Sequence, residues 1–83
     1  MEKILVEIYV PVLGCSYDMF VQPESPMYEM LVLVKKAVTE ASDGMLTTDE
    51  STVLCHREDG TILNINLSVY ELGIRNGSKL MLI

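Results

Sequence analysis

The last five residues of the chain, 79–83, constrain the fold more than any other stretch. Leu80 and Leu82 lie on one face of an alternating pattern, and Lys79, Met81 and Ile83 lie on the other. This is the pattern of a β-strand with one strongly apolar face. A strand at the end of a chain is stable only when earlier strands pair on both of its sides. The sequence therefore predicts a small sheet with its last strand in the middle.

Two strands are predicted before residue 23. Residues 3–10 alternate, with the apolar residues Ile4, Val6, Ile8 and Val10 on one face. Pro11 ends this strand, and Gly14 allows the tight turn that follows. Residues 16–22 form the return strand, which has Tyr17, Met19 and Val21 on one face and Asp18 and Phe20 on the other. The pair is expected to be a hairpin.

A helix of about sixteen residues is predicted next. We expect Ser25 to be its N-cap, Pro26 its first residue and Gly44 its left-handed C-terminal cap. An apolar stripe recurs at three- and four-residue steps. Its members are Met27, Met30, Leu31, Val34, Val38 and Ala41.

The second half of the chain contains a third strand over 52–57, a turn at Asp59-Gly60, a short additional strand over 62–65 and a helical turn over 68–72. The register of the third strand is ambiguous. We favour Val53 and Cys55 inward over Leu54 and His56 inward. Because the helix must cross the sheet with right-handed connectivity, the last strand fits beside the first. We therefore expect one domain over 1–83 with an α+β β-grasp fold, in which one helix packs across a mixed sheet of four main strands ordered second, first, last, third.

Charge and composition narrow the classes of partner. A net charge of −6 argues against nucleic acid and against an anionic membrane surface. No apolar run approaches the roughly 20 residues that span a bilayer, and the N-terminus lacks the apolar core of a signal peptide. Together with only two cysteines, this predicts a cytoplasmic protein with reduced thiols.

Catalytic, metal and cofactor sites are not predicted. Cys55 and His56 are adjacent, but neighbouring residues of a strand point to opposite faces, so they cannot form a nucleophilic pair. One histidine and two separated cysteines are too few for a metal site. The acidic residues fit turns, and neither a phosphate-binding glycine loop nor a Ser-His-Asp set is present. We therefore expect no enzyme activity.

The informative residues are apolar ones that the patterns place outside the core. On the outer side of the sheet these are Leu5, Tyr9, Phe20, Met81 and Ile83, joined by Leu54 and His56 in the favoured register. A contiguous apolar patch on a surface marks an interaction site. A second group, Tyr28, Val32 and Leu33, lies on the flank of the helix. The alternative is that Met45 and Leu46 fold over part of either group.

Two stretches resemble known families. The ending, residues 68–82, resembles the ubiquitin-like superfamily, in which a turn with Leu and Tyr precedes a Gly-Ile-x-x-Gly-x-x-Leu-x-Leu strand. The stretch 17–34 is similar to the YukD/EsaB group, through Tyr17-Asp18, Val21, Pro26 and the apolar set Met27, Met30, Leu31 and Val34. These are small bacterial ubiquitin-like proteins encoded with type VII secretion systems.

The resemblance implies a non-enzymatic protein-binding module that is an accessory or regulatory component of a type VII secretion system. Its partner would be a cytoplasmic part of the machinery, such as the membrane-anchored ATPase, which would recruit it to the inner face of the membrane. Ubiquitin-type modifiers and sulfur carriers end in glycine on a flexible tail, whereas this sequence ends at Ile83 in a predicted strand. We therefore expect docking without conjugation. The alternatives are a modifier or carrier whose tail is missing, a small subunit of an enzyme complex, and a homodimer through the sheet.

Overall fold

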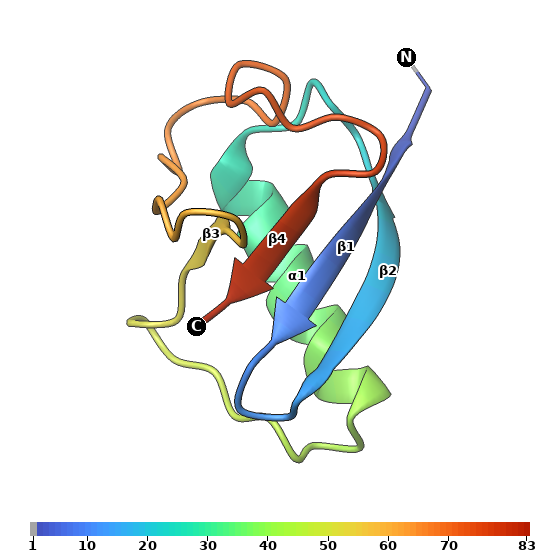
Figure 1. The fold of residues 1–83 in the computed structure, drawn as a ribbon, viewed down its shortest axis with the longest axis vertical. Helices are drawn as coiled ribbons and strands as arrows, with labels where there is room; N and C mark the ends of the chain where they lie inside the picture. The colour runs from blue at the N-terminus through green and yellow to red at the C-terminus, as the bar shows by residue number, and fades with distance from the viewer. Residues whose placement is uncertain (1) are drawn as a thin grey trace.

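A computed structural model describes residues 2–83 of the chain. Within this range the elements are β1 (Ile4–Val10), β2 (Cys15–Val21), α1 (Met27–Ala41), β3 (Leu54–His56) and β4 (Lys79–Leu82). The four strands form one sheet in the order β2-β1-β4-β3, and α1 crosses behind it (Figure 1). This confirms the predicted α+β β-grasp architecture and strand order.

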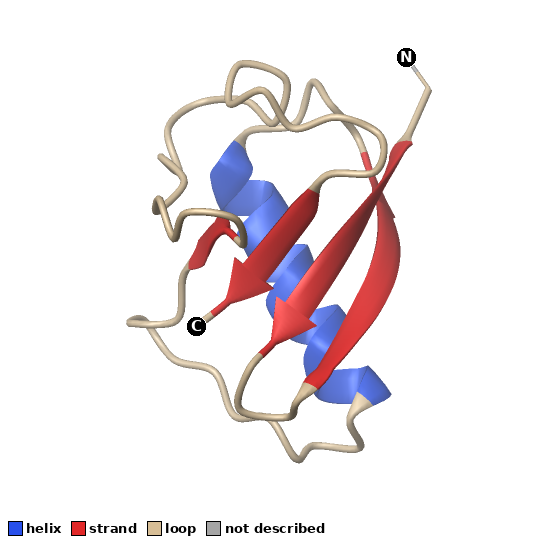
Figure 2. Cartoon of the chain, in the orientation of Figure 1, coloured by secondary structure: helices blue, strands red, loops and turns tan. Residues whose placement is uncertain are grey.

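The last strand occupies the centre of the sheet, as predicted. β4 pairs parallel to β1 and antiparallel to β3, whereas β1 and β2 form an antiparallel hairpin. Figure 2 shows β4 between β1 and β3, with loops connecting the elements at both ends of the sheet. The pairing continues past the strand, because Ile83 and Val53 exchange backbone hydrogen bonds of 2.9 and 3.0 Å.

The core lies between the sheet and α1. The alternating apolar residues of β1 and β4 meet the apolar stripe of the helix there, which is why both periodicities are visible in the sequence. The shared cluster includes Val6, Ile8, Val10, Leu80 and Leu82 from the sheet and Met27, Met30, Val34 and Val38 from the helix. Leu31 packs against this cluster, whereas Ala41 at the end of the helix is exposed.

The start of α1 differs from the prediction. Pro26, with an extended backbone at φ −65° and ψ 148°, is the N-cap, and it has no side-chain capping bond. Ser25 is therefore not the cap. The backbone N–H groups of Met27 and Tyr28 instead donate to carbonyl oxygens of Leu67 and Ile65, at 2.8 and 3.2 Å. Tertiary contacts thus satisfy donors that a side-chain cap usually satisfies.

The register of β3 is the reverse of the one we favoured. Leu54 pairs with Leu82 and His56 with Leu80, so both lie on the helix side of the sheet. Cys55 pairs with Met81 on the opposite side, yet it is fully buried. The predicted additional strand is reduced to a single bridge between Ile62 and Cys55. That bridge covers the free edge of β3.

Candidate protein-binding surface

The outer face is the sheet surface that points away from α1. We define it by Leu5, Glu7 and Tyr9 of β1, Ser16, Asp18 and Phe20 of β2, Lys79 and Met81 of β4, and Arg57 just beyond β3. Strand alternation places these residues there because their neighbours in the chain face the core. Phe20 and Arg57 are exposed, while Leu5, Tyr9 and Met81 are half-buried.

Strand pairing sorts the outer face into cross-strand rows. Leu5 lies beside Phe20 in one apolar row, and Tyr9 lies beside Met81 in another. A charged row separates them, in the order Asp18, Glu7, Lys79, Arg57 from β2 to β3. The outer face is therefore two apolar rows divided by charges, and the predicted continuous apolar patch is interrupted.

Arg57 reaches across this face. One of its guanidinium nitrogens lies 3.4 Å from the Glu7 carboxylate, and its central carbon lies 4.2 Å from the centre of the Tyr9 ring. Both charged side chains remain partly accessible, so the ion pair contributes little to folding. The contact with Tyr9 is a cation–π interaction, which is worth about 0.5–1 kcal/mol at an exposed site and more once water is removed.

The structure places five of the seven predicted binding residues on this side of the sheet. Leu5, Tyr9, Phe20 and Met81 belong to the outer face, and Ile83, 53% exposed, continues its alternation beyond β4. The prediction that Leu54 lies on the surface is wrong, because this side chain is only 2% exposed and belongs to the core. The prediction that His56 lies on the outer face is also wrong, because His56 is in one cross-strand row with Ile8 and Leu80, on the helix side of the sheet.

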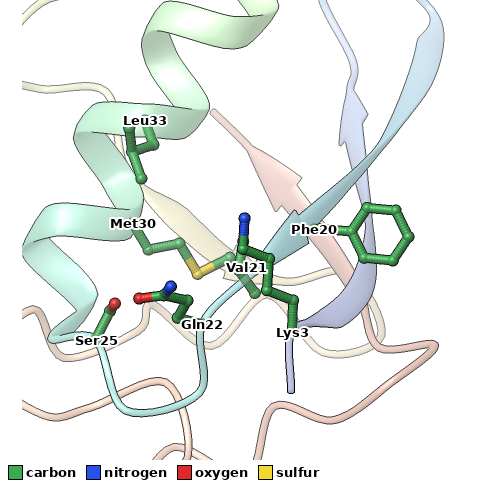
Figure 3. Close-up of a pocket in the computed structure, with 7 residues that line it drawn as sticks. All are labelled: Lys3, Phe20, Val21, Gln22, Ser25, Met30 and Leu33. Carbon is green, nitrogen blue, oxygen red and sulfur yellow. The ribbon is translucent and has the colours of Figure 1, made fainter. Parts of the chain in front are cut away.

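A groove lies between the edge strand β2 and α1. It has a volume of about 230 Å³ and is lined by Lys3, Phe20, Val21, Gln22, Ser25, Met30 and Leu33. Figure 3 shows Met30 and Val21 at the groove, while the Phe20 ring points away from the helix. Phe20 therefore sits on the rim, and most of its surface belongs to the outer face.

The flank of the helix is a second exposed apolar group, as predicted. Tyr28, Val32 and Leu33 are between 52% and 63% exposed. The alternative was that Met45 and Leu46 together cover part of one of these apolar groups, and the structure does not show this. Leu46 is buried in the core cluster, and Met45 is 78% exposed.

The sequence pattern places Asp18 and Lys79 on the outer face, but the predicted binding residues include none of the charged residues of this face. The signal was present, since the alternation that assigns Leu5 and Tyr9 to one face also assigns Glu7 to it. Lys79 and Met81 are related in the same way. Arg57 could not be placed, because its position depends on the register of β3.

The structure offers no nucleophile at Cys55. Cys55 and His56 lie on opposite sides of the sheet, and the Cys55 thiol donates to the carbonyl oxygen of Met81 at 3.5 Å. Burial, followed by the negative charge of Asp59, raises the pKa of this thiol. A nucleophilic cysteine needs the opposite shift. Within residues 2–83, no three His, Cys, Asp or Glu side chains gather as a metal site would need.

Within the same range, no helix has both the length and the apolar character needed to cross a membrane.

A four-stranded sheet of this order with one crossing helix is the ubiquitin-like β-grasp fold, and the solved structures that match the chain have that fold. One is the ubiquitin-like domain of EccD5 from Mycobacterium xenopi, with a TM-score of 0.82 and 22% identity over 100% of this chain and 94% of that one. Another is the ubiquitin-like domain of the Mycobacterium tuberculosis type VII secretion protein ECCD1, with a TM-score of 0.79 and 16% identity over 100% and 99%.

A third match is a much longer chain of the MycP5-free ESX-5 inner membrane complex. Its TM-score is 0.72 at 18% identity, and all of this chain corresponds to 21% of that one. No protein-family model matches the sequence, and a search of curated proteins finds no match. At these identities the likeness establishes the fold alone.

Proposed function

We propose that this chain is a non-enzymatic ubiquitin-like module that binds a protein component of a type VII secretion apparatus through its outer face. The fold supports this, because ubiquitin-like domains of two EccD proteins superpose over the whole chain. A domain of the same fold is part of a chain in the ESX-5 inner membrane complex. The membership of this chain in the YukD/EsaB group stays a prediction from its sequence.

The apolar rows of the outer face, with Phe20 exposed and Leu5, Tyr9 and Met81 half-buried, carry the proposal. Phe20 is 64% exposed, and Tyr9 and Met81 lie side by side beyond the charged row. Aromatic residues and methionine are enriched at protein interfaces, because they bury a large area or adapt to a partner's shape. The charges between the rows would orient the partner more than they strengthen binding.

The partner we propose is a cytoplasmic part of the secretion machinery, with the membrane-anchored ATPase as the first candidate. Binding to it would hold this chain at the inner face of the membrane. The module itself supplies no catalytic group in this picture. It contributes a rigid sheet, which presents its side chains without the entropic cost of ordering a loop.

Replacing Phe20 tests the proposed face. Phe20→Asp should weaken binding to the purified cytoplasmic region of the ATPase at least tenfold, because a charge would replace an apolar anchor at the interface. Isothermal titration calorimetry would measure the dissociation constants. Circular dichroism should show an unchanged fold, since the ring is mostly exposed.

Val32→Asp is the matched control, because Val32 is 63% exposed on the flank of α1. It should leave the dissociation constant within about twofold of the unmodified chain. If Val32→Asp weakens binding and Phe20→Asp does not, the helix flank is the binding surface and the outer face is not. If the unmodified chain does not bind the ATPase region, that partner is wrong.

A further inference from the structure

The charged row of the outer face changes sign in the middle of the sheet. Asp18 on β2 and Glu7 on β1 are acidic, whereas Lys79 on β4 and Arg57 beyond β3 are basic. The change falls between β1 and β4, the two central strands. A row with two negative and two positive charges in this order is complementary to a second copy of itself in the reverse order.

We propose that the outer face binds a second copy of this chain around a two-fold axis that runs parallel to the strands between β1 and β4. In such an interface each contact occurs twice. Glu7 of each copy faces Lys79 of the other, and Asp18 faces Arg57. An axis running across the strands would instead place Glu7 against Glu7, and opposed like charges are unfavourable.

The apolar row beside the charges fits the same axis. Tyr9 and Met81 are direct neighbours on β1 and β4. The proposed rotation exchanges these strands, so Tyr9 of each copy would lie on Met81 of the other. A methionine sulfur against an aromatic ring is a favourable contact. The strands of the two sheets would also run nearly parallel, which is the aligned form of sheet packing.

Arg57 would take part by leaving its present partners, the Glu7 carboxylate and the face of the Tyr9 ring. Its ion pair with Glu7 spans 3.4 Å, and both side chains are partly accessible, at 39% and 29%. Such a pair is weak, so the exchange for a carboxylate of the second copy costs little. Each Glu7 would then be paired with Lys79 of the opposing copy.

The size of the face indicates a weak dimer. Four strands span about 19 Å, and three rows extend about 20 Å along them. The projected area is about 400 Å² on each copy, half of the roughly 800 Å² of a standard interface. We therefore expect a weak dimer whose formation depends on protein concentration.

The second copy would cover the surface proposed above for the secretion partner. The competition between the two occupants rests on the proposed function, whereas the dimer itself needs no secretion protein. A dimer without ATPase binding would overturn only the proposed function. ATPase binding without a dimer would overturn only this inference.

Reversing the charge of Glu7 or of Lys79 tests the proposed two-fold axis. Glu7→Lys and Lys79→Glu should each weaken self-association at least tenfold, because each turns two attractive contacts into two repulsive ones. An equal mixture of the two variants should dimerise like the unmodified chain, since every facing pair is again opposite in sign. Sedimentation velocity between about 10 µM and 1 mM would measure this.

Glu40→Lys and Lys36→Glu are matched controls, because they make the same changes in net charge at exposed positions of α1. Each should dimerise like the unmodified chain. If either outer-face variant is unfolded by circular dichroism, the double variant Glu7→Lys with Lys79→Glu replaces the mixture and should dimerise. A monomeric unmodified chain at 1 mM, single variants that still dimerise, or folded variants that do not recover in the mixture would each overturn the proposal.

Discussion

Leu54 and Cys55 are adjacent in a strand, and both are buried, although alternation allows only one of them to face the helix. Leu54 belongs to the core cluster, and Cys55 lies on the other side of β3 beside Met81. The segment after β3 folds back, since the Leu63 N–H donates to the Leu54 carbonyl oxygen at 3.0 Å. Burial on both sides of β3 explains why its sequence, Leu-Cys-His, carries no clear alternation.

The effect of truncating Leu54 on stability tests the observed register of β3, in which this side chain belongs to the core. Leu54→Ala should lower the free energy of unfolding by about 2–5 kcal/mol, because it opens a cavity in the core. Leu33→Ala, at a position 57% exposed on α1, should change it by about 0.5 kcal/mol or less. Urea denaturation would give both values. Similar small effects for the two variants would contradict the observed register.

The segment 65–71 completes the start of α1. Leu67 and Ile65 accept the first helical N–H groups, and the Val69 N–H donates to the Ser25 carbonyl oxygen at 2.9 Å. The segment is held by a capping box of its own. The Ser68 N–H donates to the Glu71 carboxylate at 2.9 Å, and the Glu71 N–H donates to the Ser68 hydroxyl at 3.0 Å.

The Ser68–Glu71 cap should make stability depend on acid. Hydrogen bonds from the Ser68 backbone and side chain lower the pKa of Glu71 below its ordinary value of 4.5. A carboxyl group whose pKa is lowered by folding stabilises the fold above its unfolded pKa and loses that contribution as the pH falls through its folded pKa. Glu71→Gln should therefore be less stable than the unmodified chain at pH 7, with a difference that shrinks below about pH 4.5.

Urea denaturation at pH 7 and pH 3 would measure this difference. A difference of equal size at both pH values would show that the Glu71 charge plays no part in the cap. Asp49 and Asp59 also have lowered pKa values, because each accepts hydrogen bonds from residues two positions ahead. The unmodified chain and Glu71→Gln should therefore both still lose stability in acid.

The whole molecule depends on β4. β1 and β2 form a hairpin early in the chain, whereas β3 joins the sheet only through β4. Leu80 and Leu82 also fill the core beneath α1. Removing this strand would separate the hairpin from β3 and expose the apolar side of both.

Deleting residues 79–83 should abolish the folded state. A domain of this size has only about 5–15 kcal/mol of stability. Burial of Leu80 and Leu82 contributes about 3–6 kcal/mol, and loss of the strand would also remove the backbone pairing that joins β1 to β3. Circular dichroism and the dispersion of amide NMR signals would report the loss. The control Ile83→Ala keeps the backbone pairing with Val53 and should unfold in one cooperative transition close to that of the unmodified chain. A cooperative transition in the deletion variant would contradict this role of β4.

The sequence alone determined the helix, the presence of all four strands, the core stripe and the strand order. These follow from local periodicities of 2 and 3.6 residues, and from the rule that a crossing helix returns its chain with one handedness. It also determined four outer-face residues, Leu5, Tyr9, Phe20 and Met81, because each alternates with buried neighbours.

Only the tertiary structure decided the register of β3, the start of α1 and the alignment of the charges. β3 is short and buried on both sides, so alternation cannot orient it. The donors at the start of α1 bond to carbonyl groups about forty residues away in the chain, which no capping pattern reveals. The order of charges on the outer face depends on the register in which β1, β4 and β3 pair. The pairing register is set by packing of the whole core. Alternation in the sequence therefore places Asp18, Glu7 and Lys79 on this face but does not show that they lie in one row with Arg57.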